Sequence, residues 1–289
     1  VMTIVSALEG MAGAIEEDLN QMGPATFVVT RIGLITSEEQ FWEQIKRKPI
    51  DCSAIELIKE SCPLVDKLSP RARQFTSIKH GDQSMRDIRV RGVNASFIDI
   101  YDLEVEQGRF HSYEDDLYRR PVVFIGDLVR ETFFEGRDPI GKEFKIGPKK
   151  YTVIGVAKKQ GTMFGQSQDN FVVIPYSAFS SQFGIPRRGL DIVIKANTVE
   201  VLDAAMDQVR IVLRAQRHVP YDQPDDFAMV TADAILDLLN QVTKILRMGL
   251  VGISSISVVV GGIVVMNIMM VSVTERTREI GIRKSVGAR

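Results

Sequence analysis

The segment Gly136–Glu143, GRDPIGKE, comes nearest to a known chemical motif. It nearly matches the phosphate-binding loop G-x-x-x-x-G-K-[ST], in which glycine backbone surrounds phosphates and a hydroxyl binds Mg²⁺. Glu143 stands where that hydroxyl is needed, and the following residues, EFKIGPKKYTV, alternate as a strand rather than opening a helix. Because no helix N-terminus would meet a phosphate, we interpret the segment as a structural turn. We predict neither an ATPase motif nor a bound cofactor in this chain.

Other residue types that perform chemistry are scattered. His80, His111 and His218 have no partner at helical spacing, so the sequence predicts no metal site. The pairs Asp115-Asp116 and Asp225-Asp226 lie in loop-like segments, where we expect them to be solvated. No nucleophile and base stand together, although distant segments can assemble such a site. We therefore expect a protein that is not an enzyme.

The two cysteines, Cys52 and Cys62, lie in the segment DCSAIELIKESCP. This segment predicts one short helix that begins near Asp51 or Ser53 and ends before Pro63. Ten residues of helix span about 15 Å, whereas a disulfide needs Cα atoms within about 7 Å. We expect two unpaired thiols, buried or partly buried.

A long uncharged segment near the C-terminal end indicates how the chain is organised. Residues 248–274, MGLVGISSISVVVGGIVVMNIMMVSVT, carry no formal charge. About 20 apolar residues span the hydrocarbon core of a bilayer, so we predict a transmembrane helix here. The alternative is a very apolar core helix of a soluble domain. The net charge of the chain, −1, favours neither nucleic-acid binding nor a disordered acidic tail.

The flanks of this span predict its orientation. Residues 275–289, ERTREIGIRKSVGAR, contain five basic residues, whereas residues 231–247 contain only Lys244 and Arg247. Basic residues collect on the cytoplasmic side of membrane helices. We therefore expect the C-terminal end in the cytoplasm and residues 1–247 mostly outside it.

Two amphipathic segments, residues 1–23 and 231–247, flank the extracytoplasmic part. Each carries one apolar stripe at helical spacing. We expect the two helices to pack together as a stalk; the alternative is two unrelated surface helices. The stripes consist of Ile4, Leu8, Met11, Ile15 and Leu19 in the first segment, and of Ile235, Leu239, Val242 and Leu246 in the second.

The residues between the stalk segments predict an α+β fold. Strand-like segments at 25–33, 65–75, 76–80 and 84–92 accompany two helices, and a further strand, helix and strand follow residue 189. From Asn94 the chain changes to short strands separated by glycine, proline and aspartate turns. We therefore expect an α+β subdomain at 24–95 and 189–230, with a β-rich subdomain, 96–188, inserted into it.

Small and polar residues within the span indicate contact with other membrane helices. Ser257 and Gly261 form a small-xxx-small pair, and Gly262 adds a second small residue beside Gly261, so a neighbouring helix could approach closely here. Asn267 can form a hydrogen bond to another helix. The alternative is the general enrichment of glycine in membrane helices.

The string VGGIVVMNIMMVSVTERTREIGIRKSVGAR, residues 260–289, strongly resembles part of MacB-like and FtsX-like ABC transporter permeases. That part is their second transmembrane helix and the cytoplasmic segment after it. Upstream, RRPVVFIG, DPIGK, YTVIGV and VVIPY resemble the periplasmic core domain of the family. The resemblance implies a porter-like α+β part with an inserted β-rich part. It also implies a longer protein, with one membrane helix before Val1 and two after Arg289.

The resemblance further implies that residues 275–289 dock on an ABC ATPase, on the same chain or on a separate subunit. ATP and Mg²⁺ would be bound there. The alternative is a basic flank held only by lipid phosphates. The residues that match this segment are Glu275, Arg276, Arg278, Glu279, Gly281, Arg283, Lys284 and Gly287.

By resemblance, the function is export from a bacterial inner or plasma membrane. Stalk helices would transmit ATP-driven movement to the periplasmic domain and expel drugs, peptides or lipid-linked cargo. The partners implied are a second permease subunit, in a homodimer or heterodimer, and a periplasmic adaptor with an outer-membrane channel. The alternative is an FtsX-like mechanical signalling protein that activates a partner such as a cell-wall hydrolase. A single-pass receptor would leave the C-terminal string unexplained.

Overall fold

The computed structural model describes residues 23–285 and 287, except 36, 102, 164–165 and 185–188. The chain divides into two compact units, Val1–Ile235 and Leu236–Arg289. Nearly all of the predicted first stalk helix, 1–23, lies outside the described residues and stays a prediction.

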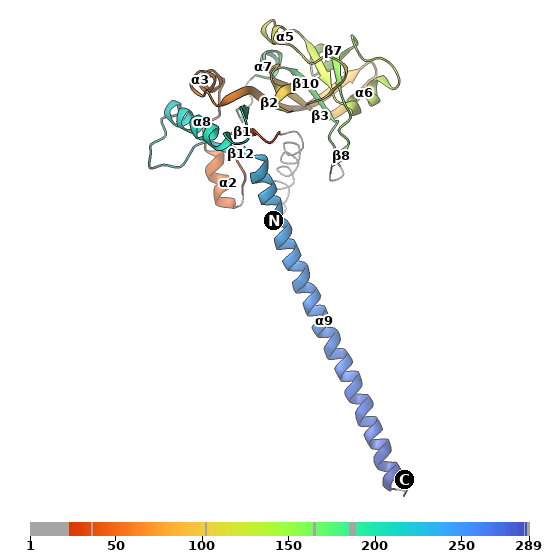
Figure 1. The fold of residues 1–289 in the computed structure, drawn as a ribbon. Helices are drawn as coiled ribbons and strands as arrows, with labels where there is room; N and C mark the ends of the chain where they lie inside the picture. The colour runs from red at the N-terminus through yellow and green to blue at the C-terminus, as the bar shows by residue number, and fades with distance from the viewer. Residues whose placement is uncertain are drawn as a thin grey trace. The chain divides into compact units, whose positions relative to one another are not determined.

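Ten strands of the first unit form one mixed sheet (Figure 1). Its order is β12-β1-β11-β2-β3-β10-β5-β7-β4, and β6 pairs with both β2 and β7. The pairs β3/β10 and β5/β7 are parallel, and the other pairs are antiparallel. The strands of this sheet are β1 (Thr26–Thr30), β2 (Val65–His80), β3 (Gln83–Val93), β4 (Val105–Gly108), β5 (Val122–Ile125), β6 (Glu143–Ile146), β7 (Lys149–Ala157), β10 (Phe171–Pro175), β11 (Asp191–Ala196) and β12 (Ala228–Thr231). The short strands β8 (Thr162–Met163) and β9 (Gln166–Ser167) pair separately.

Six of these strands close into a barrel. From β2, each strand pairs with the next in the order β3, β10, β5, β7 and β6, and β6 pairs back with β2. One apolar cluster joins these strands to helices α6 (Asp127–Phe134) and α7 (Tyr176–Phe183). It includes Ile78, Val90, Phe144, Val153 and Ile174. Closure leaves these six strands with no unpaired edge among them.

Strands β11, β1 and β12 continue the sheet from β2. Helices α3 (Ser53–Ser61) and α8 (Leu202–Gln216) share one apolar cluster with these strands. Helix α8 buries Ala205, Val209 and Leu213, which stand four residues apart on one face. A third cluster uses the alternate side chains Val28 and Val193 and includes helix α4 (Phe97–Ile100). The remaining helices are α2 (Glu38–Ile45), α5 (Tyr113–Leu117) and α9 (Ala232–Ser285).

The α+β architecture agrees with the sequence-based prediction, but two details differ. The predicted strands 65–75 and 76–80 are one strand, β2, with a shift in register between Thr76 and Ile78. The barrel also takes β2 and β3 from the segment assigned to the other subdomain. The two-subdomain division stays a prediction, because the first compact unit includes both parts.

Helix α3 lies where the cysteine-bearing segment predicts it, and both thiols are free. Cys62 is buried, whereas Cys52 is exposed, which contradicts the expectation that both are at least partly buried. The reason is that Cys52 precedes the first turn of the helix. Its Sγ lies 2.9 Å from the hydroxyl of Tyr176.

Asp115 contradicts the expectation of a solvated acidic pair. Its side chain is fully buried and forms a capping box with Ser112, the residue before the first turn of α5. Arg109 and Arg120 bring guanidinium nitrogens to 2.6 and 3.2 Å from its carboxylate. Burial alone would raise the pKa of Asp115, but the hydrogen bonds from Arg109 and Ser112 hold it well below its usual range. The carboxylate is therefore a structural anion.

His111 gives the domain a pH-dependent stability. It is 3% exposed, and its Nε2 lies 3.1 Å from the carbonyl oxygen of Val93. Burial lowers the pKa of His111 to about 4, against a smaller opposing effect of Asp116. The unfolded pKa is about 6.5, so the unfolded chain binds more protons between these values. Stability is therefore lost as the pH falls from 6.5 towards 4.

We expect the free energy of unfolding to be about 2 kcal/mol lower at pH 5 than at pH 7.5. It can be followed by the reactivity of the buried Cys62 thiol in a Cys52→Ser background. His111→Gln, whose amide can still donate to the Val93 carbonyl, should remove most of this difference. An undiminished pH dependence in that variant would show that other groups cause it.

Candidate functional site

Helix α9 connects the sheet domain to the apolar span without interruption. It runs for 54 residues, Ala232–Ser285, directly after β12. The backbone nitrogen of Ala234 donates to Thr231 Oγ1 at 3.2 Å, which satisfies one free N–H at the start of the helix. No proline interrupts these residues. At 1.5 Å per residue the helix is about 80 Å long.

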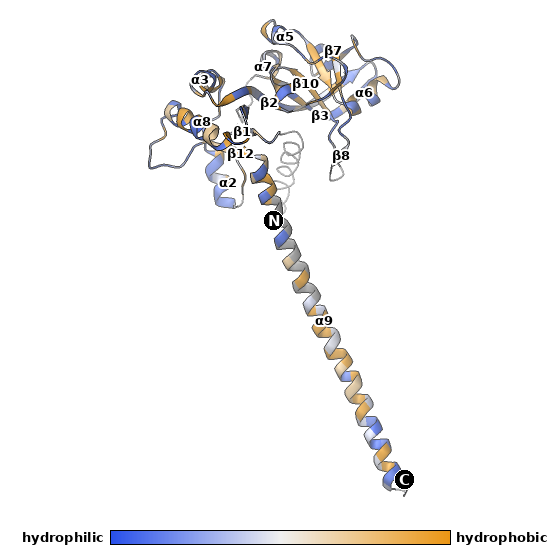
Figure 2. Ribbon diagram, viewed as in Figure 1, coloured by the Kyte–Doolittle hydropathy of each residue, from blue (hydrophilic) through white to orange (hydrophobic). Residues whose placement is uncertain are grey.

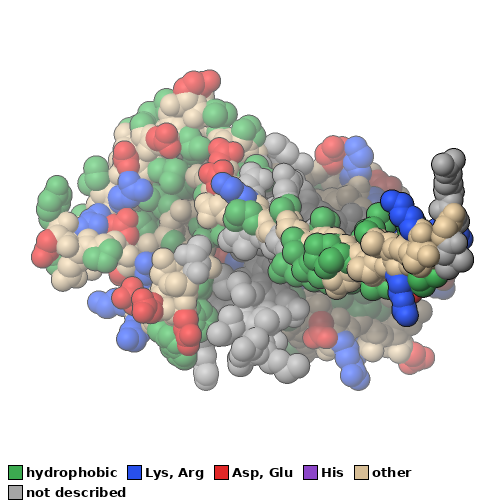
Figure 3. Space-filling model, turned by 90° about the horizontal axis from the view of Figure 1, so that it is seen from below, with side chains coloured by type: hydrophobic (Ala, Val, Ile, Leu, Met, Phe, Trp, Pro, Cys, Tyr) green, Lys and Arg blue, Asp and Glu red, His purple; other side chains and the backbone are tan. Residues whose placement is uncertain are grey.

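The second unit carries an exposed apolar surface typical of a membrane helix. Within Ser255–Ser285, an 18-residue window has a mean hydropathy of 2.4, and none of this window is buried. Ile256 and Val258 are 66% and 75% exposed. Hydrophobic colour dominates α9 before its charged end in Figure 2, and green side chains gather on the same stretch in Figure 3, before the blue side chains of the basic end. The predicted span, 248–274, lies within α9, and the helix continues beyond it through the charged residues.

The basic end of α9 is exposed along its length. Arg276 and Glu279 form an ion pair at 3.6 Å, one helical turn apart. Gly281 lies within the helix with open space where a Cβ would stand. Gly287 follows the helix with a φ of +85°, a conformation that glycine adopts at helix ends. Docking of these residues on an ATPase stays a prediction, as does the role of Glu275, Arg278, Arg283 and Lys284.

The packing residues within the span lie on two faces of α9. Ser257 and Gly261 are four residues apart, so they share one face. Asn267 follows Gly261 by six residues, which turns it onto a different face at 100° per residue. Contacts of these residues with neighbouring helices stay predictions.

The second stalk segment is only partly described. Ile235 is 1% exposed and belongs to the first compact unit. Leu239, Val242 and Leu246 lie in the helical backbone of α9. Their side chains, and the partner stripe from Ile4 to Leu19, lie outside the described residues.

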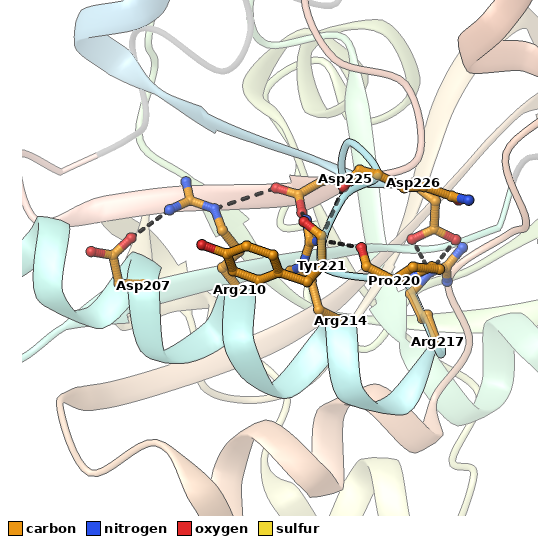
Figure 4. A network of polar contacts seen from close by, with 9 residues as sticks. Asp207, Arg210, Arg214, Arg217, Pro220, Tyr221, Asp225 and Asp226 are labelled. Carbon is orange, nitrogen blue, oxygen red and sulfur yellow. Dashed lines mark hydrogen bonds and ion pairs between the residues drawn. The ribbon is translucent and has the colours of Figure 1, made fainter.

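An arginine network that the sequence analysis missed holds the loop before β12 against α8 (Figure 4). Arg214 contacts the Asp225 carboxylate at 2.6 Å and donates to the carbonyl oxygen of Pro220. Arg217 Nε lies 2.7 and 2.8 Å from the two carboxylate oxygens of Asp226. This acidic pair is therefore ion-paired, which contradicts the expectation from the sequence that it would be solvated. Arginines at helical spacing before an acidic loop were the signal available for it.

The near-match to a phosphate loop is a turn between a helix and a strand. Gly136 and Gly141 have φ values of +75° and +77°, which glycine adopts without strain. Glu143 begins strand β6, so no helix starts there, as expected. Among the described residues, no cluster of histidine, cysteine and acidic side chains could hold a metal ion.

Comparison with known proteins identifies the family. Residues 1–212 match the model of the MacB-like periplasmic core domain. A macrolide export ATP-binding/permease protein MacB from Hahella chejuensis is 33% identical over 293 residues, covering 100% of this chain and 43% of that protein. The MacB of Bdellovibrio bacteriovorus is also 33% identical, over 97% of this chain and 43% of its own length. The chain thus spans less than half the length of these relatives.

Solved structures show the same fold. The periplasmic region of MacB from Actinobacillus actinomycetemcomitans matches with a TM-score of 0.62 and 17% identity, over 78% of this chain and 98% of that one. The extracellular domain of the transporter YknZ from Gram-positive bacteria matches with a TM-score of 0.56 and 17% identity, over 71% and 100%. These findings do not favour the FtsX-like alternative. The chain belongs to the MacB-like family of ABC transporter permeases and contains its periplasmic core domain.

Proposed function

We propose that this chain is the part of an exporter that converts ATP-driven movement into motion of an extracytoplasmic domain. The single observation that carries the proposal is the continuity of α9 from β12 through the apolar span to the basic end. A stiff helix transmits displacement, whereas a flexible linker would absorb it. The fixed loop before β12 supports this role, because it holds the strand from which α9 starts.

In this proposal the basic end lies in the cytoplasm and contacts an ABC ATPase, which binds ATP and Mg²⁺. The basic flank favours that orientation. A second permease subunit would complete the membrane part, and a periplasmic adaptor with an outer-membrane channel is a further partner. The cargo would be a drug, a peptide or a lipid-linked molecule; the relatives are named for macrolide export, which supports a drug.

Helix-weakening substitutions in the stalk test the transmission. Glycine costs a helix about 1 kcal/mol per residue relative to alanine. We expect Leu239→Gly plus Val242→Gly to reduce transport at least about tenfold while ATP hydrolysis continues, because a softened helix absorbs the movement. Transport and ATP hydrolysis would be measured on the full-length protein in proteoliposomes.

The matched control is Leu239→Ala plus Val242→Ala, which removes the same side chains but favours the helix. It separates loss of stiffness from loss of packing. Undisturbed transport in the glycine variant would refute the role of α9 as a lever. Equal loss in both variants would assign the effect to side-chain packing instead.

A further inference from the structure

Three neighbouring strands of the barrel each contribute one lysine to a single row. Lys79 of β2 stands opposite Lys145 of β6, and Lys145 stands opposite Lys150 of β7. All three are exposed. Because neighbouring strands lie about 4.8 Å apart, each of these side chains leaves the sheet about 5 Å from the next one in the row. We call them the lysine row.

The lysine row lies on the outer surface of the barrel. Side chains alternate along a strand, and the residues next to the lysines are buried in the barrel core. These residues are Ile78, Ile146 and Tyr151, none of them more than 1% exposed. The lysines therefore point away from that core.

Like charges directly opposite each other on a sheet are destabilising. One carboxylate relieves part of this repulsion: Glu143 lies 3.3 Å from the ammonium of Lys150. Within the described part of the chain, Lys79 and Lys145 form no ion pair. The row thus keeps an excess of positive charge that a partner with negative charge would neutralise.

An exposed aromatic side chain stands on the same face. Phe75 precedes Lys79 by four residues of β2 and is 59% exposed. The register shift lies in β3, which has two residues between Ile88 and Met85 where β2 has one between Thr76 and Ile78. The side chains of β2 therefore alternate between the two faces without interruption, which places Phe75 and Lys79 on the same face. The guanidinium of Arg89 lies 6.0 Å from the centroid of the Phe75 ring and orients it.

We propose that this face, formed by Phe75, Arg89 and the lysine row, docks an acidic segment of a partner protein. Aromatic and arginine side chains are the typical anchors of protein interfaces. On a helix, side chains three or four residues apart lie about 5–6 Å from each other. Glutamates at that spacing match the spacing of the lysine row.

The same observations favour a protein over an anionic lipid surface. A uniformly negative bilayer repels Glu143, which stands beside the row, whereas a protein can place an uncharged or basic group there. Phe75 also lies about 13 Å along the strand from Lys79, a distance suited to an apolar pocket beside an acidic helix. The proposal concerns the barrel alone, so its failure would leave the role of α9 untouched.

The test measures binding of a fluorescein-labelled helical peptide with glutamates at every third or fourth position. The 289-residue chain is used in phosphatidylcholine nanodiscs at low ionic strength, and binding is followed by fluorescence anisotropy. We expect Lys79→Gln, Lys145→Gln and Lys150→Gln together to weaken binding about tenfold. Phe75→Ala should weaken it about fivefold.

The matched control removes three exposed lysines from other surfaces: Lys46→Gln, Lys59→Gln and Lys149→Gln. Lys149 belongs to the same strand as Lys150 but reaches Ser181 of α7 at 3.3 Å. This control should change binding less than twofold, because only non-specific attraction is lost. Equal weakening by both triple variants would overturn the proposal, as would the absence of peptide binding to the unchanged chain.

Vesicles containing phosphatidylglycerol form a separate arm. Binding of these vesicles, but not of the peptide, through the lysine row would show that the occupant is lipid and would overturn the proposed protein partner. A version of the peptide with glutamine in place of glutamate should not bind, because the row then has no carboxylates to contact. Binding of that peptide at equal strength would also contradict the proposal.

Discussion

Replacing Glu275 and Arg278 together by alanine should abolish the stimulation of ATP hydrolysis by the membrane part. The two residues stand three apart on one side of exposed helix. Their joint removal deletes one charge of each sign, so the net charge stays the same, and four of the five basic residues that favour the cytoplasmic side remain. If both groups are desolvated against an ATPase, losing the contact costs about 2–5 kcal/mol. The expected result is a fall to basal ATP hydrolysis.

The measurement is ATPase activity of the full-length protein with its nucleotide-binding partner, together with co-purification of the two. Asp237→Ala plus Lys244→Ala is the matched control, because it also removes one charge of each sign but lies before the span. That control should retain stimulation. Unchanged activity in the Glu275 and Arg278 variant, with assembly intact, would show that the basic end only sets the orientation of the membrane helix.

Gly155→Ala should destabilise the barrel by about 3 kcal/mol. Gly155 pairs with β4 and β5, and a Cβ there would lie 2.3 Å from the carbonyl oxygen of Arg109. The same Cβ would lie 3.0 Å from the backbone nitrogen and carbonyl carbon of Arg109. These are backbone atoms, so no rotamer change relieves the clash. The strand pair β4/β7 must separate.

Thiol labelling of Cys62 in a Cys52→Ser background measures this loss of stability. Gly81→Ala is the control: it forces a side chain onto a φ of +57°, but its Cβ meets nothing within 4 Å. Its expected cost is about 1 kcal/mol. Similar stability in both variants would mean that β4 moves aside without cost.

The sequence by itself determined the features that depend on local chemistry. The uncharged run before Glu275 predicts a helix for the bilayer, because lipid excludes charge and unsatisfied backbone over the whole of such a span. The segments after residue 189 predict a strand, a helix and a strand, and the structure has β11, α8 and β12 there. The strand after Lys142 excludes a phosphate loop. In each case the deciding residues are neighbours in the chain.

The tertiary structure alone decided which distant residues meet. Nothing in the sequence states that β6 pairs with both β2 and β7, and without that closure Lys79 and Lys145 would not be opposite each other. Strand pairing and burial come from contacts between segments far apart in sequence. Periodicity describes only the face that each segment presents, so the partner of that face is set by the packing of the whole domain.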